Sequence, residues 1–296
     1  MGKLVRGQWL NDAQLEKFTA EQYEKSGGQF QRASSDVFRD WISKEGVSGF
    51  KAEAGRYHLY GAINCPWAHR ALIYRKIKGL ENIIGLSLVQ PRRNEDGWVF
   101  NNKSDSHRFV DHLFGFDALH QVYVKADPGF SGRVTVPVLW DKKTQTIVNN
   151  ESAEIIRMLN SAFAEITGNN SDFYPSALAA RIDELNDYIY QNINNGVYRT
   201  GFARTQQAYD ENVLKVFAAL DALDERLKDQ NYLLGDRITE ADWRLLPTLM
   251  RFDVAYHSAF KCNIRMLRDY PHLSRYLCQL YRYPGVAETV DLDVYR

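Results

Sequence analysis

The sequence has few cysteines and no excess of either charge. Cys65, Cys262 and Cys278 are the only cysteines among 296 residues. An odd, widely spaced set argues against a disulfide framework. Lys and Arg together number 37, as do Asp and Glu, so the formal net charge is zero. Such a balance does not favour capture of nucleic acid or of an anionic membrane. We therefore expect a protein of the reducing cytoplasm.

Long apolar runs are also missing. No stretch approaches the roughly 18 apolar residues of a membrane span, and the first residues contain no apolar run of signal-peptide length. Hydrophobic residues nevertheless make up 45% of the chain, with 17 Tyr, 15 Phe and 6 Trp. This composition is typical of a globular protein with thick cores, and the length is sufficient for two domains.

The apolar pattern divides the chain into an extension and two domains. Residues 1–55 are polar, but aromatic side chains such as Trp41 indicate an ordered extension. Residues 56–167 predict a small α/β domain with a mixed sheet, interrupted by a long polar insertion at 90–132. Its expected elements are a strand at 57–62, a helix at 66–78, a strand at 83–89, a hairpin at 135–149 and a helix at 151–163. After a linker, residues 176–296 show helical spacing and predict an all-α domain.

Cys65 stands where the first predicted strand turns into a helix. Pro66 occupies a favoured first helical position. A thiol at this point faces the free N–H groups and the positive end of the helix, which favour the thiolate. Ala68 fills the fourth position of Cys-Pro-Trp-Ala, so no second cysteine can form an internal disulfide. A buried, inert cysteine is the alternative, but the setting favours a nucleophile whose partner is an external thiol.

Val136-Pro137 is a second candidate site. A proline that opens a strand can be a simple edge feature. In thiol-handling domains with this order of elements, a cis proline exposes the backbone N–H and C=O of the preceding residue. A peptide ligand can then pair with them like an added strand. The residues alone leave both interpretations open.

Glu151 and Ser152 form a third candidate site, at the start of a predicted helix. Asn150 or Ser152 can simply cap that helix, with Glu151 favoured by the helix dipole. Alternatively, Ser152 and nearby N–H groups bind a ligand carboxylate, and Glu151 pairs with a ligand ammonium group. A γ-glutamyl group carries both charges, so glutathione fits this site.

Five segments together resemble the Xi class of glutathione transferases, the S-glutathionyl-hydroquinone reductases. The similarity runs in register from about residue 30 to about residue 290. The segments are Asn64-Cys-Pro-Trp-Ala68, Gly132-Arg-Val-Thr-Val-Pro-Val-Leu-Trp140, Asn149-Asn-Glu-Ser152, Asn195-Gly-Val-Tyr-Arg-Thr-Gly-Phe-Ala203 and Thr239-Glu-Ala-Asp-Trp243.

The resemblance implies a thioredoxin-like N-terminal domain, an α-helical C-terminal domain and a homodimer. It also implies that glutathione reduces glutathionyl-hydroquinones to hydroquinones, with release of glutathione disulfide. Matching positions make Cys65 the nucleophile, Tyr198 the proton donor and Tyr256 a tyrosine that helps to lower the pKa of the cysteine. The implied glutathione site comprises Trp98, Arg133, Val134, Thr135, Val136, Glu151 and Ser152. The family also has a tyrosine in a C-terminal tail, with which Tyr295 does not fall in register.

The implied chemistry passes through a mixed disulfide. The Cys65 thiolate attacks the glutathionyl sulfur of the aryl thioether, and Tyr198 protonates the ring carbon as the hydroquinone leaves. A second glutathione then resolves the Cys65–glutathione disulfide. Trp67, Tyr198, Phe202 and Tyr256 are candidates for the wall that holds a flat ring, although the same tyrosines could equally be helix-packing core residues.

Two other functions stay open. A general omega-like thiol transferase, which removes glutathione from proteins or small disulfides, would use the same Cys65. Tyr198 and the 90–132 insertion favour the hydroquinone substrate instead. A non-catalytic ligand-binding protein on this fold is also conceivable, but Cys65, Glu151 and Ser152 argue against it because a silent relative does not need an activated thiol.

Several other conspicuous residues are interpreted as structural. Cys262 and Cys278 lack the strand–helix setting of Cys65. Thr239 and Asp242 fit a capping box, in which the Asp242 side chain reaches back to the N–H of the capping residue.

The histidines of the insertion do not predict a metal site. His107, His112 and His120 lie there with Asp105 and Asp111, but at spacings that match no zinc pattern. We expect a solvated polar loop and no metal.

Overall fold

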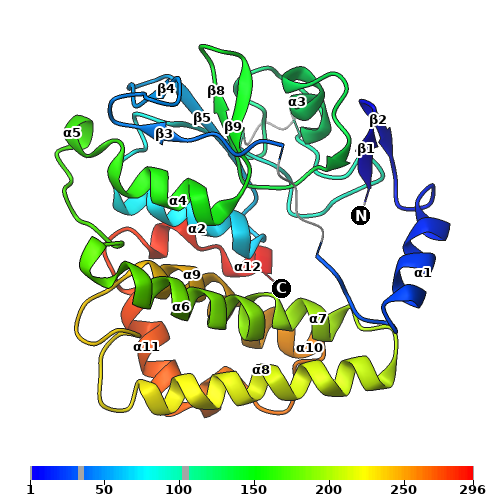
Figure 1. Ribbon diagram of the computed structural model, residues 1–296, viewed down its shortest axis with the longest axis vertical. Helices are drawn as coiled ribbons and strands as arrows, with labels where there is room; N and C mark the ends of the chain where they lie inside the picture. Colours follow the sequence, from blue (N-terminus) through cyan, green and yellow to red (C-terminus); the bar gives the residue numbers. More distant parts are fainter. Residues whose placement is uncertain (1, 33–36, 102–106, 296) are drawn as a thin grey trace. The chain divides into compact units, whose positions relative to one another are not determined.

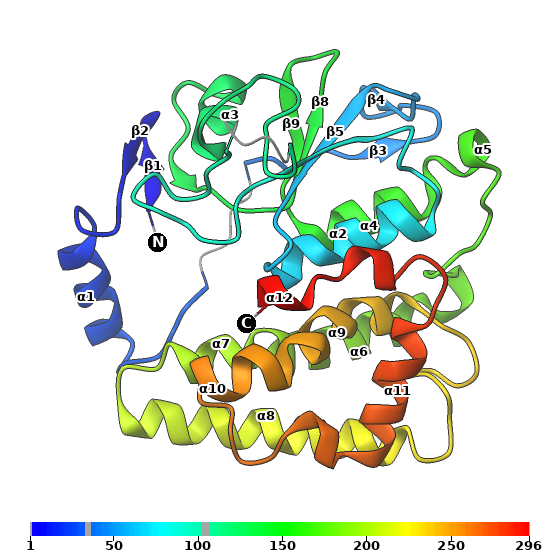
Figure 2. The ribbon, with the colours of Figure 1, turned by 180° about the vertical axis from the view of Figure 1, so that it is seen from behind.

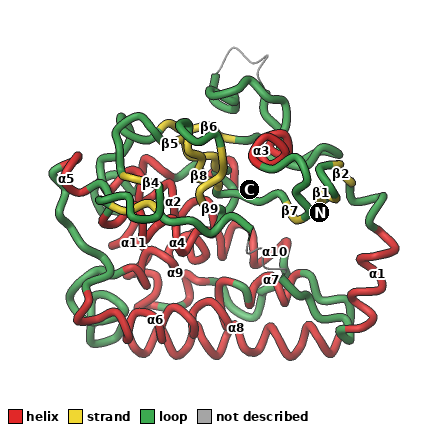
Figure 3. The backbone as a smooth tube through the Cα atoms, turned by 45° about the horizontal axis from the view of Figure 1, so that its top comes forward, coloured by secondary structure: helices red, strands yellow, loops and turns green. Residues whose placement is uncertain are grey.

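The computed structural model describes residues 2–32, 37–101 and 107–295. Its contacts divide the chain into two compact units. The thioredoxin-like unit comprises residues 1–18 and 34–171, and the helical unit comprises residues 19–33 and 172–296. The extension expected at 1–55 therefore contributes residues to both units. The first unit mixes strands with helices, whereas the second contains helices and loops (Figure 3).

A four-stranded mixed sheet forms the centre of the thioredoxin-like unit (Figure 1). Its order is β6-β5-β8-β9. The strands are β5 (Tyr57–Gly61), β6 (Gly85–Leu88), β8 (Val138–Asp141) and β9 (Thr146–Asn149). β5 and β6 are parallel, as a strand–helix–strand connection allows, and β8 is antiparallel to both β5 and β9. The predicted mixed sheet and the hairpin are confirmed.

Helices cover both faces of this sheet. α2 (Pro66–Ile77) and α4 (Ser152–Ser161) lie side by side on one face (Figures 1 and 2). α3 (Leu119–Ala126) lies against the other face, where its Leu119 and Val122 join Tyr60, Val138 and Trp140 in one buried cluster. The 90–132 insertion thus carries a helix of its own, as a connection of that length suggests.

Shorter elements complete the thioredoxin-like unit. A three-stranded antiparallel sheet, β2-β1-β7, joins the start of the chain to the segment that precedes Val136. The remaining bounds are β1 (Lys3–Val5), β2 (Gln8–Leu10), β7 (Gly132–Arg133), the parallel pair β3 (Ile42–Ser43) and β4 (Phe50–Lys51), α5 (Ala164–Thr167), and α1 (Glu16–Lys25), which spans the division between the units.

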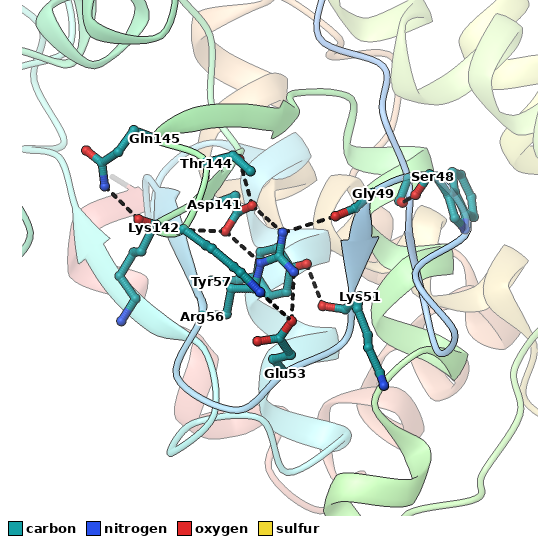
Figure 4. Close-up of polar contacts among 12 residues, drawn as sticks. Ser48, Gly49, Lys51, Glu53, Arg56, Tyr57, Asp141, Lys142, Thr144 and Gln145 are labelled. Atoms are coloured by element: carbon teal, nitrogen blue, oxygen red, sulfur yellow. Dashed lines mark hydrogen bonds and ion pairs between the residues drawn. The ribbon is translucent and has the colours of Figure 1, made fainter.

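A buried ion pair joins the start of β5 to the end of β8 (Figure 4). Arg56 donates from Nε to Asp141 Oδ1 at 2.8 Å and from Nη2 to Asp141 Oδ2 at 2.6 Å. Asp141 also accepts the Lys143 N–H and the Thr144 hydroxyl. A bidentate pair with every lone pair engaged fixes geometry, so it holds the β8–β9 hairpin against β5.

The helical unit contains helices of very unequal length, and the predicted all-α domain is confirmed. Its long elements are α6 (Ala179–Ile189), α8 (Gln206–Arg226), α9 (Glu240–Arg251) and α11 (Pro271–Tyr281). Its short ones are α7 (Gly196–Gly201), α10 (His257–Ala259), α12 (Leu292–Tyr295) and the 3₁₀ turns Ser176–Leu178, Leu267–Asp269 and Ala287–Thr289.

Two π-helical turns, which the sequence did not predict, follow α6 and α9. They span Tyr190–Asn194 and Phe252–Tyr256. The first leads into α7, which carries Tyr198, and the second ends at Tyr256. Turns of this kind are rare but often occur at functional sites, and the second one contains Tyr256.

The capping box of α9 is confirmed. Asp242 Oδ2 accepts the Thr239 N–H at 2.7 Å. Oδ1 of the same carboxylate accepts the Leu233 N–H at 3.0 Å and the Tyr276 hydroxyl at 2.8 Å. Asp242 is fully buried in these contacts, so its role is structural: it connects the start of α9 to Leu233 and to α11.

Candidate active site

Cys65 occupies the setting that the sequence predicts. It is the N-cap residue of α2, with extended backbone angles (φ −82°, ψ 119°), and Pro66 opens the helix. Its carbonyl accepts the His69 N–H at 3.0 Å, which closes the first helical turn. The side chain is half-buried, and its thiol is not part of a disulfide. A thiol at this point experiences the orphan N–H groups and the positive end of the helix dipole.

Val136 is the member of the predicted backbone-pairing segment that lies beside this thiol. Its carbonyl oxygen is 4.0 Å from Cys65 Sγ. The Val136–Pro137 peptide bond is cis, as the functional interpretation of this motif expects. The preceding residues have other partners: Arg133 pairs with Lys3 of β1, and Val134 packs in the buried core.

At the start of α4, Glu151 is the N-cap residue, so the alternative in which Asn150 or Ser152 caps the helix does not hold. Glu151 Oε1 accepts the Ala153 N–H at 3.0 Å and the Ser152 hydroxyl at 3.2 Å. A carboxylate competes well for the orphan N–H groups because it also interacts with the helix dipole. The Glu151 N–H is itself bonded to Asn149 Oδ1 at 2.8 Å. A carboxylate, a hydroxyl and helix N–H groups therefore meet at one point.

Arg70, which the sequence did not lead us to expect, brings a positive charge to the start of α4. Its Nη1 lies 3.4 Å from Ser152 Oγ, and its guanidinium lies 4.6 Å from the centre of the Trp67 ring. The side chain is only 2% exposed. The sequence could have indicated this contact. Trp67 and Arg70 are three residues apart on the helix that follows Cys65, and residues at that spacing lie on the same face of a helix.

Trp98 is anchored in the insertion next to α3. Its carbonyl accepts the Leu119 N–H at 2.8 Å, and its half-buried ring packs against the core cluster that includes Tyr60 and Leu119. The Arg93 guanidinium lies 5.3 Å from the centre of the ring. These contacts give the ring a fixed orientation.

Tyr198 and Tyr256 belong to an aromatic cluster in the helical unit, together with Phe202 and Phe260. The ring centres of Tyr198 and Tyr256 lie 6.1 Å apart. The ring centre of Phe260 lies 5.3 Å from that of Tyr198 and 5.0 Å from that of Tyr256. Phe202 contacts Phe260 at 5.1 Å. The rings are tilted or edge-on, which is the arrangement that aromatic quadrupoles favour.

Arg32 is a second residue that the sequence reasoning missed. Its guanidinium lies 4.6 Å from the centre of the Tyr198 ring, and its Nε donates to Asn195 Oδ1 at 2.8 Å. The N-terminal segment thus contributes a cation to a phenol that lies more than 160 positions further along the chain. No local pattern could indicate this contact.

The other cysteines differ from Cys65. Cys262 is buried, and this burial raises the pKa of its thiol to about 12, so it stays protonated and inert. Cys278 is exposed on α11 and therefore has no part in the core.

The histidines of the insertion serve local packing. His120 stacks on Trp9 with ring centres 5.0 Å apart, and the His112 N–H is bonded to Ser87 Oγ. Asp105, which the sequence analysis grouped with them, lies outside the described residues. Within 2–32, 37–101 and 107–295, no group of three or more His, Cys, Asp or Glu side chains could hold a metal ion.

Comparisons with known proteins place the chain in a family. Family models for the N-terminal and C-terminal domains of glutathione S-transferase match residues 64–162 and 206–277. The chain is 49% identical over 299 residues to the glutathionyl-hydroquinone reductase YqjG of Escherichia coli, covering 99% of this chain and 88% of that one. It is 47% identical over 292 residues to the glutathionyl-hydroquinone reductase PcpF of Sphingobium chlorophenolicum, covering 99% and 89%.

Solved structures agree with this placement. A Xi class glutathione transferase from Natrialba magadii superimposes with a TM-score of 0.89 at 45% identity, covering 100% of this chain and 87% of that one. The glutathione-bound structure of YqjG gives a TM-score of 0.85 at 49% identity, covering 91% and 89%. The chain therefore belongs to the glutathione transferase family, in its Xi class. Among the described residues, no helix combines the length and the apolar character needed to cross a membrane.

Proposed function

We propose that this protein is an enzyme that uses glutathione to reduce S-glutathionyl-hydroquinones to hydroquinones, with release of glutathione disulfide. The observation that carries the proposal is its 49% identity, over nearly the whole chain, to a glutathionyl-hydroquinone reductase. The chemistry of Cys65 adds support, because a half-buried thiol at a helix N-terminus, without a neighbouring cysteine, suits a nucleophile that an external thiol resolves.

The first half of the reaction transfers glutathione to the enzyme. The Cys65 thiolate attacks the glutathionyl sulfur of the aryl thioether and forms a sulfur–sulfur bond. The carbon–sulfur bond breaks, and its electron pair goes to the ring carbon. Tyr198 donates a proton to that carbon, and the hydroquinone leaves. The ring carbon is thereby reduced and the two sulfurs are oxidised to a disulfide.

The second half restores the enzyme. The thiolate of a second glutathione attacks the glutathionyl sulfur of the mixed disulfide, which releases glutathione disulfide and the Cys65 thiolate. The proton that this glutathione loses replaces the one that Tyr198 donated. In balance, one aryl thioether and one glutathione give one hydroquinone and one glutathione disulfide.

Glutathione is the ligand that the polar part of the site fits. We assign its γ-glutamyl carboxylate to Ser152 and Arg70 and its ammonium group to Glu151, since these groups meet at the start of α4. Its peptide would pair with the backbone of Val136, whose carbonyl lies beside Cys65. The rest of the proposed site is Trp98, Arg133, Val134 and Thr135.

The aromatic cluster is proposed to hold the hydroquinone ring and to supply the proton. Tyr198 is the donor in this assignment, with Arg32 over its ring. Tyr256 lies in the same cluster, and we propose that it helps to stabilise the thiolate during the reaction. Tilted rings of this kind offer both faces and edges to a flat ligand.

We also propose that the enzyme is a homodimer of the reducing cytoplasm. Three free cysteines, one of them exposed, are compatible with a reducing compartment. Light scattering coupled to size-exclusion chromatography measures the molar mass in solution directly, and a monomeric mass would rule out the dimer.

Mass spectrometry after incubation with a glutathionyl-hydroquinone tests the proposal. We expect one glutathione to be added to the protein, at Cys65 in the peptide map, and the adduct to disappear when glutathione is supplied. Free hydroquinone should appear in equal amount. A hydroquinone that forms without any Cys65 adduct would contradict the mechanism.

A general thiol transferase would form the same adduct from a simple mixed disulfide. Turnover on the two substrates separates the two functions. The proposal requires the aryl thioether to be reduced with the higher kcat/KM. A preference for glutathionylated peptides, with little turnover of the thioether, would favour the omega-like activity.

A further inference from the structure

Tyr123 of α3 has a buried hydroxyl that the mechanism does not use. Its ring packs against those of Phe38 and Phe130, with ring centres 5.9 Å and 5.2 Å away, and the side chain is fully buried. The hydroxyl donates to the Thr135 carbonyl at 3.0 Å. It accepts the Thr135 N–H at 3.3 Å and the Asn150 side-chain amide at 3.1 Å. The hydroxyl also lies 3.3 Å from Thr135 Oγ1. A phenol has one donor and two acceptor positions, so this one is fully engaged.

The partners of this hydroxyl belong to the two segments that form the glutathione site. Thr135 immediately precedes Val136, and the two carbonyls have different neighbours: that of Thr135 is bonded to Tyr123, whereas that of Val136 lies 4.0 Å from Cys65 Sγ. Asn150 immediately precedes Glu151, the N-cap of α4. The hydroxyl therefore ties together the two ends of the β8–β9 hairpin, close to the thiol at one end and to the helix N-terminus at the other.

Packing alone does not require a tyrosine here. The neighbouring rings are phenylalanines, and a phenylalanine at 123 would fill the same apolar space. Burial raises the pKa of Tyr123, so the phenol stays protonated and remains a donor to the Thr135 carbonyl. A buried hydroxyl must find partners, and here those partners are the backbone and the side chain of site segments.

We infer that Tyr123 is a positioning residue for glutathione. Its hydroxyl sets the separation and orientation of the Thr135–Val136 and Asn150–Glu151 segments, so that one glutathione molecule can pair with the first through its peptide and with the second through its γ-glutamyl group. Tyr123 touches no reacting atom. The inference rests on the proposed glutathione site and adds the residue that holds its two halves in register.

Replacing Tyr123 by phenylalanine removes the hydroxyl and keeps the ring. We expect Tyr123→Phe to weaken glutathione binding about tenfold, because three site groups lose their shared partner. The KM for glutathione should rise by a similar factor, while kcat changes less than about threefold because the reacting groups are untouched. Isothermal titration with glutathione and steady-state kinetics measure the two effects.

Tyr57→Phe is the matched control. Tyr57 is equally buried in the same unit, and its hydroxyl donates to the Lys51 carbonyl at 2.7 Å, away from the glutathione segments (Figure 4). This variant should lose comparable thermal stability and keep the wild-type affinity for glutathione. Equal losses of affinity in both variants would reduce the role of Tyr123 to general stability and overturn the inference.

Asn150→Ala on its own keeps the test decisive if Tyr123→Phe folds poorly, and where both variants fold the two changes form a double-mutant cycle. Asn150→Ala leaves the Tyr123 ring in place and should weaken glutathione binding about threefold on its own. The two changes combined should cost less than the product of their separate effects, because they break a shared contact. Strictly multiplicative effects would overturn the inference.

The same measurements separate this inference from the proposed function. If the wild-type protein binds glutathione and reduces glutathionyl-hydroquinones, but Tyr123→Phe binds glutathione within twofold of it, the inference fails and the function stands. If the wild-type protein binds glutathione without reducing the thioether, and Tyr123→Phe still loses about tenfold in affinity, the function fails and the positioning role stands.

Discussion

The two units of this protein hold the residues of the proposed site with different interactions. In the thioredoxin-like unit, side-chain and backbone hydrogen bonds of about 3 Å fix Thr135, Glu151 and Ser152. In the helical unit, ring contacts with centres 5.0 to 6.1 Å apart hold Tyr198 and Tyr256. Hydrogen bonds are directional and accept one ligand geometry, whereas aromatic surfaces accept flat ligands of several shapes. This difference suits an enzyme that binds a polar peptide cosubstrate and a flat ring.

Replacing the proposed nucleophile, Cys65, should have the largest effect. Cys65→Ser should lower thioether reduction by roughly a thousandfold or more, because a serine hydroxyl cannot form the mixed disulfide. Its binding of glutathione should change little, since the hydrogen-bonded part of the site is intact. Cys262→Ser, which alters a buried and inert thiol, is the control and should keep full activity. Substantial turnover by Cys65→Ser would remove the assigned nucleophile.

Replacing the proposed proton donor, Tyr198, tests the aromatic cluster separately. Tyr198→Phe should slow release of the hydroquinone by about a hundredfold, within the range of general acid catalysis. The ring contacts to Phe260 and Tyr256 remain, so glutathione affinity and exchange on a simple mixed disulfide should change little. Rapid-quench measurement of the hydroquinone gives the rate. An equal loss on both substrates would mean that Tyr198 does not protonate the ring carbon.

The features that could be predicted from the sequence are those encoded within a few residues. The strand, the Cys-Pro turn and the start of α2 follow from a local pattern, as does the capping box of Thr239 and Asp242. Near Glu151 the pattern located the helix start but did not identify Glu151 as the cap, because several residue types can satisfy the same N–H groups.

The missed features depend on contacts between distant parts of the chain. Arg32 meets Tyr198, and Tyr123 meets Thr135 and Asn150, although no periodicity or motif links these residues. The π-helical turn at Phe252–Tyr256 was also missed, because apolar spacing barely distinguishes a single wide turn from an α-helix. Family resemblance supplied Tyr198 and Tyr256, and the structure supplied the residues around them.

The thioredoxin-like unit should also lose stability at acid pH, because it buries a histidine. His58 of β5 is 5% exposed, and its Nε2 lies 2.8 Å from Ser87 Oγ. Burial lowers the pKa of His58 to about 4. In the unfolded chain the pKa of His58 is about 6.5, so below that pH the unfolded chain binds a proton that the folded state does not bind. The free energy of unfolding should therefore fall as the pH drops from about 6.5 to about 4, by about 3 kcal/mol in total.

Denaturant unfolding at several pH values checks this expectation. His58→Gln should flatten the pH dependence of the unfolding free energy in that window. His272→Gln, a substitution on α11 in the helical unit, should leave it as in the wild type. The same slope in His58→Gln and in the wild type would assign the acid sensitivity to other groups.

The smallest effect concerns the cation in the aromatic cluster. If Tyr198 is the proton donor, as proposed, we expect Arg32 to stabilise the negative charge on its oxygen, because the guanidinium lies 4.6 Å from the ring centre. Arg32→Met should therefore lower kcat on the aryl thioether by about threefold to tenfold, with glutathione affinity unchanged. Arg32→Lys keeps the charge but loses the bond to Asn195, so it should recover most of this loss. If the lysine variant is as slow as the methionine variant, Arg32 acts by holding Asn195 in place, and the helical unit too would depend on a directional hydrogen bond.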